Sequence, residues 1–383
     1  MRSNRRVVGL ISCLPIVAAA LFAGCGTASD DGETDTGRDA APESTTHVDP
    51  PDAATDVADS DTPEPFFDCT QDSSVDAPTH LRCAGLYDRW TKKTIKPDVH
   101  EYKPGVTFWS DGAVKRRWVS LPAGMKIDTT NMDAWKFPVG TKFFKEFVIG
   151  GKHIETRMFW KVGDTTWVKT TYQWSADEQT ATRLDTGFTQ NDAGDPDAGG
   201  YEIPALGKCD QCHNGSEDKV LGFEAVGLGH AAATGYTLAQ LVADDKLTVK
   251  PAKTTLTIPE DGKGSANALG WLHANCGTAC HNKNPGRSCT AKDMDLKLTY
   301  AELSGGGAAS TLQAYVTTIP VDATIPSGAY KRIAPGNVGN SAIHFLASHR
   351  NNTNPNGQMP PIDTHIIDPT GVGYLTTWIT ALP

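Results

Sequence analysis

Residues 209–213 combine the residue types and the spacing that can hold a haem covalently. Cys209 and Cys212 are separated by two residues, and His213 follows the second cysteine directly. In c-type haem attachment the two thiols form thioethers with the haem, and the adjoining imidazole becomes an axial ligand of the iron. A redox dithiol or half of a zinc site also uses paired cysteines, but neither requires the histidine. The motif predicts haem c at this position.

Residues 276–281 form a looser copy of the same motif. Cys276 and Cys280 are separated by three residues, and His281 follows them. Because the vinyl groups of a haem are a fixed distance apart, the extra residue requires a local bulge in the chain. We expect a second haem, held by both thiols and by His281. The alternative is a disulfide from Cys276 or Cys280 to Cys289, which would leave this region without haem.

A methionine near the C-terminus is the expected distal ligand of the second haem. Met359 lies in a Gln-Met-Pro-Pro segment, where the prolines stiffen the loop. A thioether ligand favours ferrous iron and raises the reduction potential relative to two histidines. The alternative is a loop methionine that fills a gap in the core. Three histidines are reserve candidates: His344, His349 and His365.

No motif identifies the distal ligand of the first haem. We expect His230, which follows a glycine-rich stretch, although a lone histidine is more often a surface or core residue. Met158 and His153 are the next candidates.

The first 25 residues form a targeting segment that precedes the folded protein. Arg2, Arg5 and Arg6 give a positive start, and an apolar stretch over 7–22 follows. The run ending at Cys25 resembles a bacterial lipobox, in which this cysteine is lipidated. The sequence therefore predicts an exported, lipid-anchored protein of the periplasm or outer membrane. Ordinary cleavage of a soluble export signal is the alternative.

Residues 26–65 should be a disordered acidic linker, because they hold twelve acidic residues, one arginine and almost no large apolar residue. This linker accounts for the net charge of −10, so the rest of the chain is close to neutral. The charge therefore favours no nucleic-acid partner and predicts no strong electrostatic steering.

Nine cysteines suit an exported protein, because disulfides and haem c both form outside the cytoplasm. Once Cys13 of the targeting segment, the lipidated Cys25 and the four motif cysteines are assigned, Cys69 and Cys83 remain as a natural disulfide pair. Cys289 is left over as a thiol or as a competitor for the second motif.

The sequence predicts two folded regions, a β-rich region over 66–205 and a haem-binding region over 206–383. Between 108 and 174 the apolar residues alternate with period two, which predicts an antiparallel meander of a sandwich or barrel. After residue 213 the period becomes helical. Helices are expected after Thr237, over 266–275 and 341–350, and after Asp368, which caps a helix that starts at Pro369.

The order of several short motifs resembles a family of dihaem c-type cytochromes among exported proteobacterial proteins. The motifs are FWSDG at 108–112, FPVGT at 137–141, KEF at 145–147, ETR at 155–157, Ile203-Pro204, 221–223, Asn275-Cys276, Ser341, 359–361 and Trp378-Ile379. The resemblance covers about residue 108 to the end. It implies a β-rich N-terminal part, a haem at the junction and a mainly helical, cytochrome c-like C-terminal domain. The three-residue spacing of the second motif departs from the family pattern.

These patterns favour an electron carrier with two haem c groups, whose partners are periplasmic or membrane redox proteins. The alternative is a haem-dependent, peroxidase-like oxidoreductase whose β region binds the substrate. A third hypothesis is a zinc-stabilised binding module that uses the four motif cysteines. Charged residues stand within the strand pattern at Asp111, Glu155 and Arg157. Exposed positions are expected, and the alternatives are a buried ion pair or a substrate contact.

Overall fold

The structure is a computed structural model of the chain, and its described residues belong to one compact unit, Thr62–Pro383. They are 64–72, 76–190, 201–287, 289, 293–326, 329–350 and 357–383. The expected targeting segment, Cys25 and nearly all of the acidic linker lie outside the described residues.

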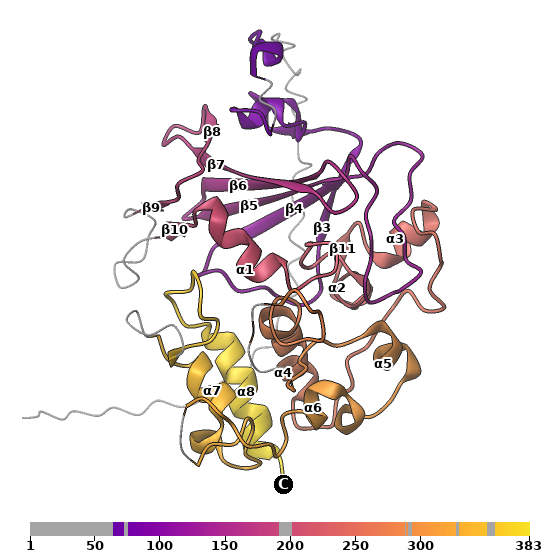
Figure 1. Ribbon diagram of the computed structural model, residues 1–383, viewed down its shortest axis with the longest axis vertical. Helices are drawn as coiled ribbons and strands as arrows, with labels where there is room; N and C mark the ends of the chain where they lie inside the picture. Colours follow the sequence, from indigo (N-terminus) through magenta and orange to yellow (C-terminus); the bar gives the residue numbers. More distant parts are fainter. Residues whose placement is uncertain are drawn as a thin grey trace, which may run out of the picture. The chain divides into compact units, whose positions relative to one another are not determined.

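Eleven short strands and eight α-helices lie within the described residues (Figure 1). The strands are β1 (Tyr87–Arg89), β2 (Thr94–Ile95), β3 (Val99–Lys103), β4 (Val114–Ser120), β5 (Lys142–Ile149), β6 (Lys152–Lys161), β7 (Trp167–Trp174), β8 (Ala181–Arg183), β9 (Phe188–Gln190), β10 (Tyr201–Ile203) and β11 (Thr234–Gly235). The helices are α1 (Cys209–His213), α2 (Ala225–Gly229), α3 (Leu238–Ala243), α4 (Ser265–Leu272), α5 (Tyr300–Gly305), α6 (Gln313–Val316), α7 (Ala342–Ala347) and α8 (Pro369–Ala381). A π-helix, His273–Gly277, continues α4.

The centre of the fold is a seven-stranded antiparallel sheet in the order β11-β3-β4-β5-β6-β7-β8. The expected meander is confirmed, since β4 to β7 follow one another along the chain and across the sheet. Gly150 and Gly151 form the turn between β5 and β6, and both have the positive φ that such a tight hairpin requires.

Both faces of the sheet are covered, which explains why the strands carry large apolar residues on either side. On one face Trp118, Phe144 and Met158 pack against the segment that contains Leu81 and Leu86. The other face packs against residues of α2, α3 and the loop before them. The expected sandwich or barrel is not formed by the described strands, because β11 and β8 are open edges and no second large sheet is present.

The chain beyond the expected boundary at 205/206 continues the packing of the sheet. The edge strand β11 pairs with β3, and Phe223, Leu228 and Leu238 belong to the same apolar core as Phe143 and Phe159. The polypeptide that carries the first motif is thus built directly onto the sheet.

Two of the expected helices, α3 and α8, are confirmed together with their N-terminal caps. Thr237 accepts a hydrogen bond from the amide of Gln240 at the start of α3, and Asp368 accepts from the amides of Thr370 and Gly371 at the start of α8. Pro369 occupies the first position of α8, where its missing amide hydrogen costs nothing.

Helices α4 and α8 pack closely against each other. The indole of Trp271 donates a 2.7 Å hydrogen bond to Asp368. A β-carbon at Gly371 would lie 2.0 Å from the Trp271 ring, so only glycine permits this approach. Leu375, Trp378 and Ile379 of α8 are fully buried in the core that α4 shares.

Cys69 and Cys83 are joined as a disulfide, with sulfur atoms 1.99 Å apart. None of the helices in the described part of the chain is both long enough and apolar enough to cross a bilayer.

Candidate cofactor sites

The first motif forms a helical turn on one face of the central sheet. Helix α1 contains the whole motif, from Cys209 to His213, and lies against the strands (Figure 1). The ring of His213 stacks on Phe159 of β6 with centroids 4.3 Å apart. Burial raises the pKa of the Cys209 and Cys212 thiols, which are both unbridged. The motif is therefore held in place by the sheet.

The imidazole of His213 is oriented by the backbone. Its Nδ1 lies 2.6 Å from the carbonyl oxygen of Lys219, and this geometry assigns the proton to Nδ1 as the donor. Burial, reinforced by the nearby Lys145, lowers the pKa of His213 to about 3, so the ring is neutral at pH 7. A neutral ring with Nδ1 engaged leaves Nε2 to bind a metal, which is the usual outer-shell arrangement of a metal-binding histidine.

A cavity of about 440 Å³, including the space at its mouth, lies beside His213. Aromatic and cationic side chains line it together: Tyr102, Phe143, Phe144, Lys145, Arg157, Phe159 and Lys219. An apolar cavity with few charged groups is typical of a cofactor site.

The structure does not bring the expected distal ligands of the first haem into this cavity. His230 lines a separate cavity with Gly105 and Trp271, where its Nδ1 accepts a hydrogen bond from the amide of Ala232. Met158 is fully buried in the core on the opposite face of the sheet. His153 lies within ion-pair distance of Glu146 and Glu178.

The second motif begins in the π-helix that continues α4 and runs into the turn after it. The amide of His281 donates to the carbonyl of Cys276 at 2.8 Å, five positions earlier, and Thr278 donates likewise to His273. This turn is wider than that of an α-helix, and it spans the three residues between Cys276 and Cys280. Neither cysteine forms a disulfide, so the alternative bridge to Cys289 is not present.

His281 and Met359 line one cavity, although 77 residues separate them in the sequence. The cavity holds about 770 Å³ with its mouth, and most of its wall is apolar: Trp271, Cys276, Met294, Leu296, Ile343, Leu346 and Ala347. The amide of Met359 donates a 2.9 Å hydrogen bond to the carbonyl of Leu346, which fixes the methionine loop to α7.

Burial shifts the pKa values of the histidine and cysteines of the second motif. It lowers the pKa of His281 to about 4, with help from Arg332, and raises the pKa of Cys276 and Cys280 to about 12. The Sγ of Cys289 lies 3.1 Å from Nδ1 of His281. The reserve candidates His344, His349 and His365 are not among the residues that line the cavity.

The two motifs touch each other, which the sequence did not indicate. A β-carbon at Gly215 would lie 1.6 Å from the carbonyl oxygen of Ala279, so the loop after the first motif rests on the backbone of the second. The side chain of Asn282 donates to the carbonyls of Gly215 at 3.1 Å and Gly277 at 2.6 Å. Gly215 lies two residues after His213, and Asn282 directly follows His281. This proximity to the motif histidines is the one sequence feature that could have pointed to the contact.

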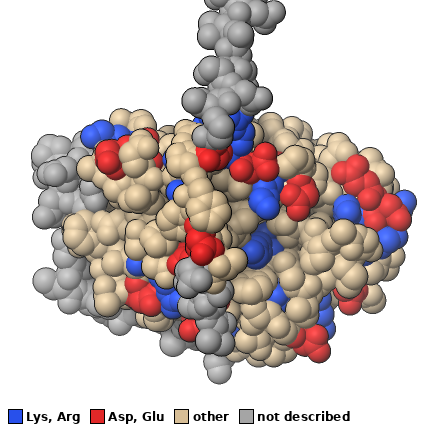
Figure 2. Space-filling view, turned by 90° about the horizontal axis from the view of Figure 1, so that it is seen from above, with Lys and Arg blue, Asp and Glu red and all other residues tan. Residues whose placement is uncertain are grey.

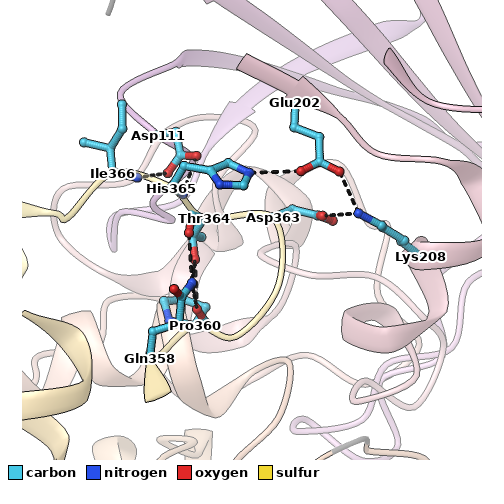
Figure 3. Close-up of polar contacts among 9 residues, drawn as sticks. All are labelled: Asp111, Glu202, Lys208, Gln358, Pro360, Asp363, Thr364, His365 and Ile366. Atoms are coloured by element: carbon cyan, nitrogen blue, oxygen red, sulfur yellow. Dashed lines mark hydrogen bonds and ion pairs between the residues drawn. The ribbon is translucent and has the colours of Figure 1, made fainter. Parts of the chain in front are cut away.

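A polar network joins the loop after Met359 to the β-rich part of the chain (Figure 3). His365 contacts Glu202 through Nε2 at 2.9 Å, and Lys208 bridges Glu202 and Asp363 at 2.6 and 3.0 Å. Because Lys208 directly precedes Cys209, this network also reaches the first motif.

The charged residues expected on an exposed face are instead structural. Asp111 accepts hydrogen bonds from the amides of His365 and Ile366 (Figure 3). Glu155 is completely buried. Its carboxylate accepts a 2.8 Å hydrogen bond from Arg157 Nε and a second hydrogen bond from the Tyr201 hydroxyl. The expectation of an exposed charge was wrong for Glu155, and the alternative of a buried ion pair is the one observed, because Arg157 and Tyr201 satisfy its carboxylate inside the protein.

No family model, curated protein or solved structure matches the chain. Within the described residues, no three His, Cys, Asp or Glu side chains converge as a metal-binding cluster. The four motif cysteines thus form no shared zinc site in this structure.

Proposed function

We propose that this protein is a c-type cytochrome that carries two covalently bound haem groups and transfers single electrons at the cell envelope. The observation that carries the proposal is the shared cavity of His281, Cys276 and Met359. An imidazole, a thiol and a thioether around one apolar cavity are the groups that a haem c with His–Met ligation requires.

The first motif supports a second haem. His213 is neutral, half-buried and oriented by Lys219, while Cys212 directly precedes it on α1 and Cys209 lies one helical turn earlier. These residues would hold the haem by two thioethers and one nitrogen ligand. When bound, haem iron exchanges one electron between its ferric and ferrous states.

The helices around the second motif favour a cytochrome c-like arrangement. Helix α4 leads into the motif, and the terminal helix α8 packs on α4 through Trp271 and Gly371. Both helices contribute to the core beside the cavity, so they would exclude water from one edge of the cofactor. This packing would help a chain with short helices to retain a haem.

The contact between the motifs provides a short path for electrons. Asn282 follows His281 directly and donates to the carbonyl of Gly215, two residues after His213. The haem groups held by these motifs would therefore be neighbours, and one electron could enter at one group and leave from the other.

The proposed location is the periplasm or outer membrane, with a lipid anchor at Cys25 and periplasmic or membrane redox proteins as partners. The export-type N-terminal sequence and the pair Cys69 and Cys83 support an oxidising compartment. Acidic and basic side chains are interspersed on the face shown in Figure 2, which favours no nucleic-acid partner.

A second candidate function is a haem-dependent oxidoreductase whose substrate binds at the first site. One observation favours it: none of His230, Met158 and His153 reaches the cavity beside His213. An axial position without a protein ligand would be open to a small molecule. Carbon monoxide binding to the reduced protein separates the candidates, because an electron carrier with two filled sites would not bind it.

The proposal is tested by pyridine haemochrome analysis of protein made with the c-type maturation machinery. We expect two haems per chain in the wild type. Replacing Cys209 and Cys212 by serine should leave one haem, and replacing Cys276 and Cys280 should leave the other. A control with Cys289→Ser should retain both.

A further inference from the structure

Three basic residues form a row across the central strands of the sheet. Arg117 of β4 is the direct cross-strand partner of Lys145 of β5, and Lys145 is the direct partner of Arg157 of β6. Directly paired residues point to the same face of a sheet. Here that face is the one on which His213 stacks against Phe159, since Phe159 lies two residues from Arg157 on β6.

This row, Arg117–Lys145–Arg157, carries more positive charge than the surrounding protein balances. Among the residues that the structure describes, Glu155 is an ion-pair partner of Arg157, and neither Arg117 nor Lys145 has one. Arg117 is 5% exposed, and its Nε is buried without a hydrogen-bond acceptor. Lys145 forms no hydrogen bond or ion pair within the described residues. Burial beside Arg117 and Arg157 holds its pKa well below the usual range, so an anion bound beside it would favour its charged form.

Unbalanced buried cations are costly for a folded protein, because each loses its hydration without gaining an opposite charge. Neighbouring cations in one row add mutual repulsion to this cost. An anionic group bound beside the row would remove both penalties, so the arrangement calls for an anion with more than one negative oxygen. Guanidinium groups suit such an anion, since each can donate two parallel hydrogen bonds to a carboxylate.

The row borders the cavity of the first motif. Lys145 and Arg157 line that cavity together with His213, and aromatic rings form much of the remaining wall. A haem has its two carboxylates on one edge of an otherwise apolar ring. We propose that the row Arg117–Lys145–Arg157 binds the propionate carboxylates of the haem held by Cys209 and Cys212. This inference rests on the proposed function, and it means that the sheet fixes the orientation of that haem.

The test compares matured dihaem variants by spectroelectrochemical titration, with resonance Raman spectra of the propionate bending modes. Arg117→Gln and Lys145→Met should lower one of the two reduction potentials, because losing a cation stabilises ferric haem. The same variants should shift a propionate band. Lys145→Arg keeps the positive charge and should therefore retain the wild-type reduction potential. Arg116→Gln is the matched control, since Arg116 directly precedes Arg117 on β4, faces the opposite way and pairs with Glu101 at the surface. It should change neither measurement.

The outcomes separate this inference from the proposed function. Two haems with unchanged potentials and propionate bands in Arg117→Gln and Lys145→Met would overturn the inference alone. Succinate binding by the wild type that is lost in Lys145→Met, with unchanged haem spectra, would assign the row to a separate anion and also overturn it. Colourless matured wild type would overturn both. If Arg117→Gln fails to accumulate, Arg117→Lys keeps the charge, and the same shift of the propionate band is expected.

Discussion

The amide of His365 donates a 2.8 Å hydrogen bond to the carboxylate of Asp111, a residue 254 positions earlier in the chain. The adjacent amide of Ile366 donates to the other carboxylate oxygen at 3.1 Å. Asp111 has a φ of 45°, which aspartate tolerates better than most residues. One carboxylate in the β-rich part therefore fixes the loop that follows Met359.

Asp111→Ala should loosen this loop and weaken the proposed coordination of haem iron by Met359. Two hydrogen bonds to a charged group are lost, so we expect the free energy of unfolding to fall by about 3 kcal/mol. The long-wavelength absorption band of sulfur-to-iron ligation should weaken in the oxidised protein. Asp111→Asn is the control, because asparagine keeps one acceptor and tolerates the same φ. An unchanged band in Asp111→Ala would show that the loop does not depend on this carboxylate.

Met359→Leu should retain both haems but abolish the sulfur-to-iron band and lower one reduction potential, because a thioether favours ferrous iron. The matched control is Met294→Leu, a methionine of the same cavity in a different loop. Both replacements preserve side-chain volume, so stability should change by less than about 1.5 kcal/mol. Loss of the band in Met294→Leu, with retention in Met359→Leu, would assign the ligand to Met294.

Gly215→Ala should disturb the contact between the two motifs. The new β-carbon would meet the carbonyl of Ala279, a backbone atom that cannot move aside alone. We expect a loss of about 3 kcal/mol in the free energy of unfolding, as is typical of overpacking. Gly207→Ala serves as the control, because a β-carbon at Gly207 meets no atom within 4 Å. Equal melting temperatures for both variants would contradict the packing described here.

Haem-free protein should lose stability in mild acid. Burial lowers the pKa of His281 from an ordinary 6.5 to about 4, so the unfolded chain binds a proton more readily than the folded protein. The contribution of His281 is complete above pH 6.5 and declines as the pH falls toward 4, by about 3 kcal/mol. His281→Gln should make this part of the profile less steep when urea unfolding is measured from pH 7 to pH 4, while His213, whose pKa burial lowers to about 3, retains part of the slope. A profile as steep as that of the wild type would exclude His281 as a cause.

The sequence predicted those helices and strands that have local sequence signals better than it predicted the tertiary contacts between them. Alternation over 114–174 and the Asp368-Pro369 cap identify β4 to β7 and α8, because each depends on neighbouring residues. The open sheet, covered on its second face by residues after 205, depends on packing that no local period encodes. Burial of Glu155 likewise follows from Tyr201 and Arg157, partners that the strand pattern does not reveal.

The site could be predicted in the same uneven way. The motif cysteines and histidines have fixed spacing, and Met359 stands beside a distinctive proline pair, so both could be named in advance. His230 could not be placed, since a lone histidine carries no positional signal. The turn from Cys276 to His281 required the structure, because the i to i+5 hydrogen bond that absorbs the extra residue is a backbone feature.

The most direct test of the central claim is peptide-level mass spectrometry of protein made with the maturation machinery. We expect one haem on the peptide that contains Cys209 and Cys212, and one on the peptide that contains Cys276 and Cys280. Unmodified thiols on both peptides, in protein from cells that mature a known c-type cytochrome in parallel, would contradict the account.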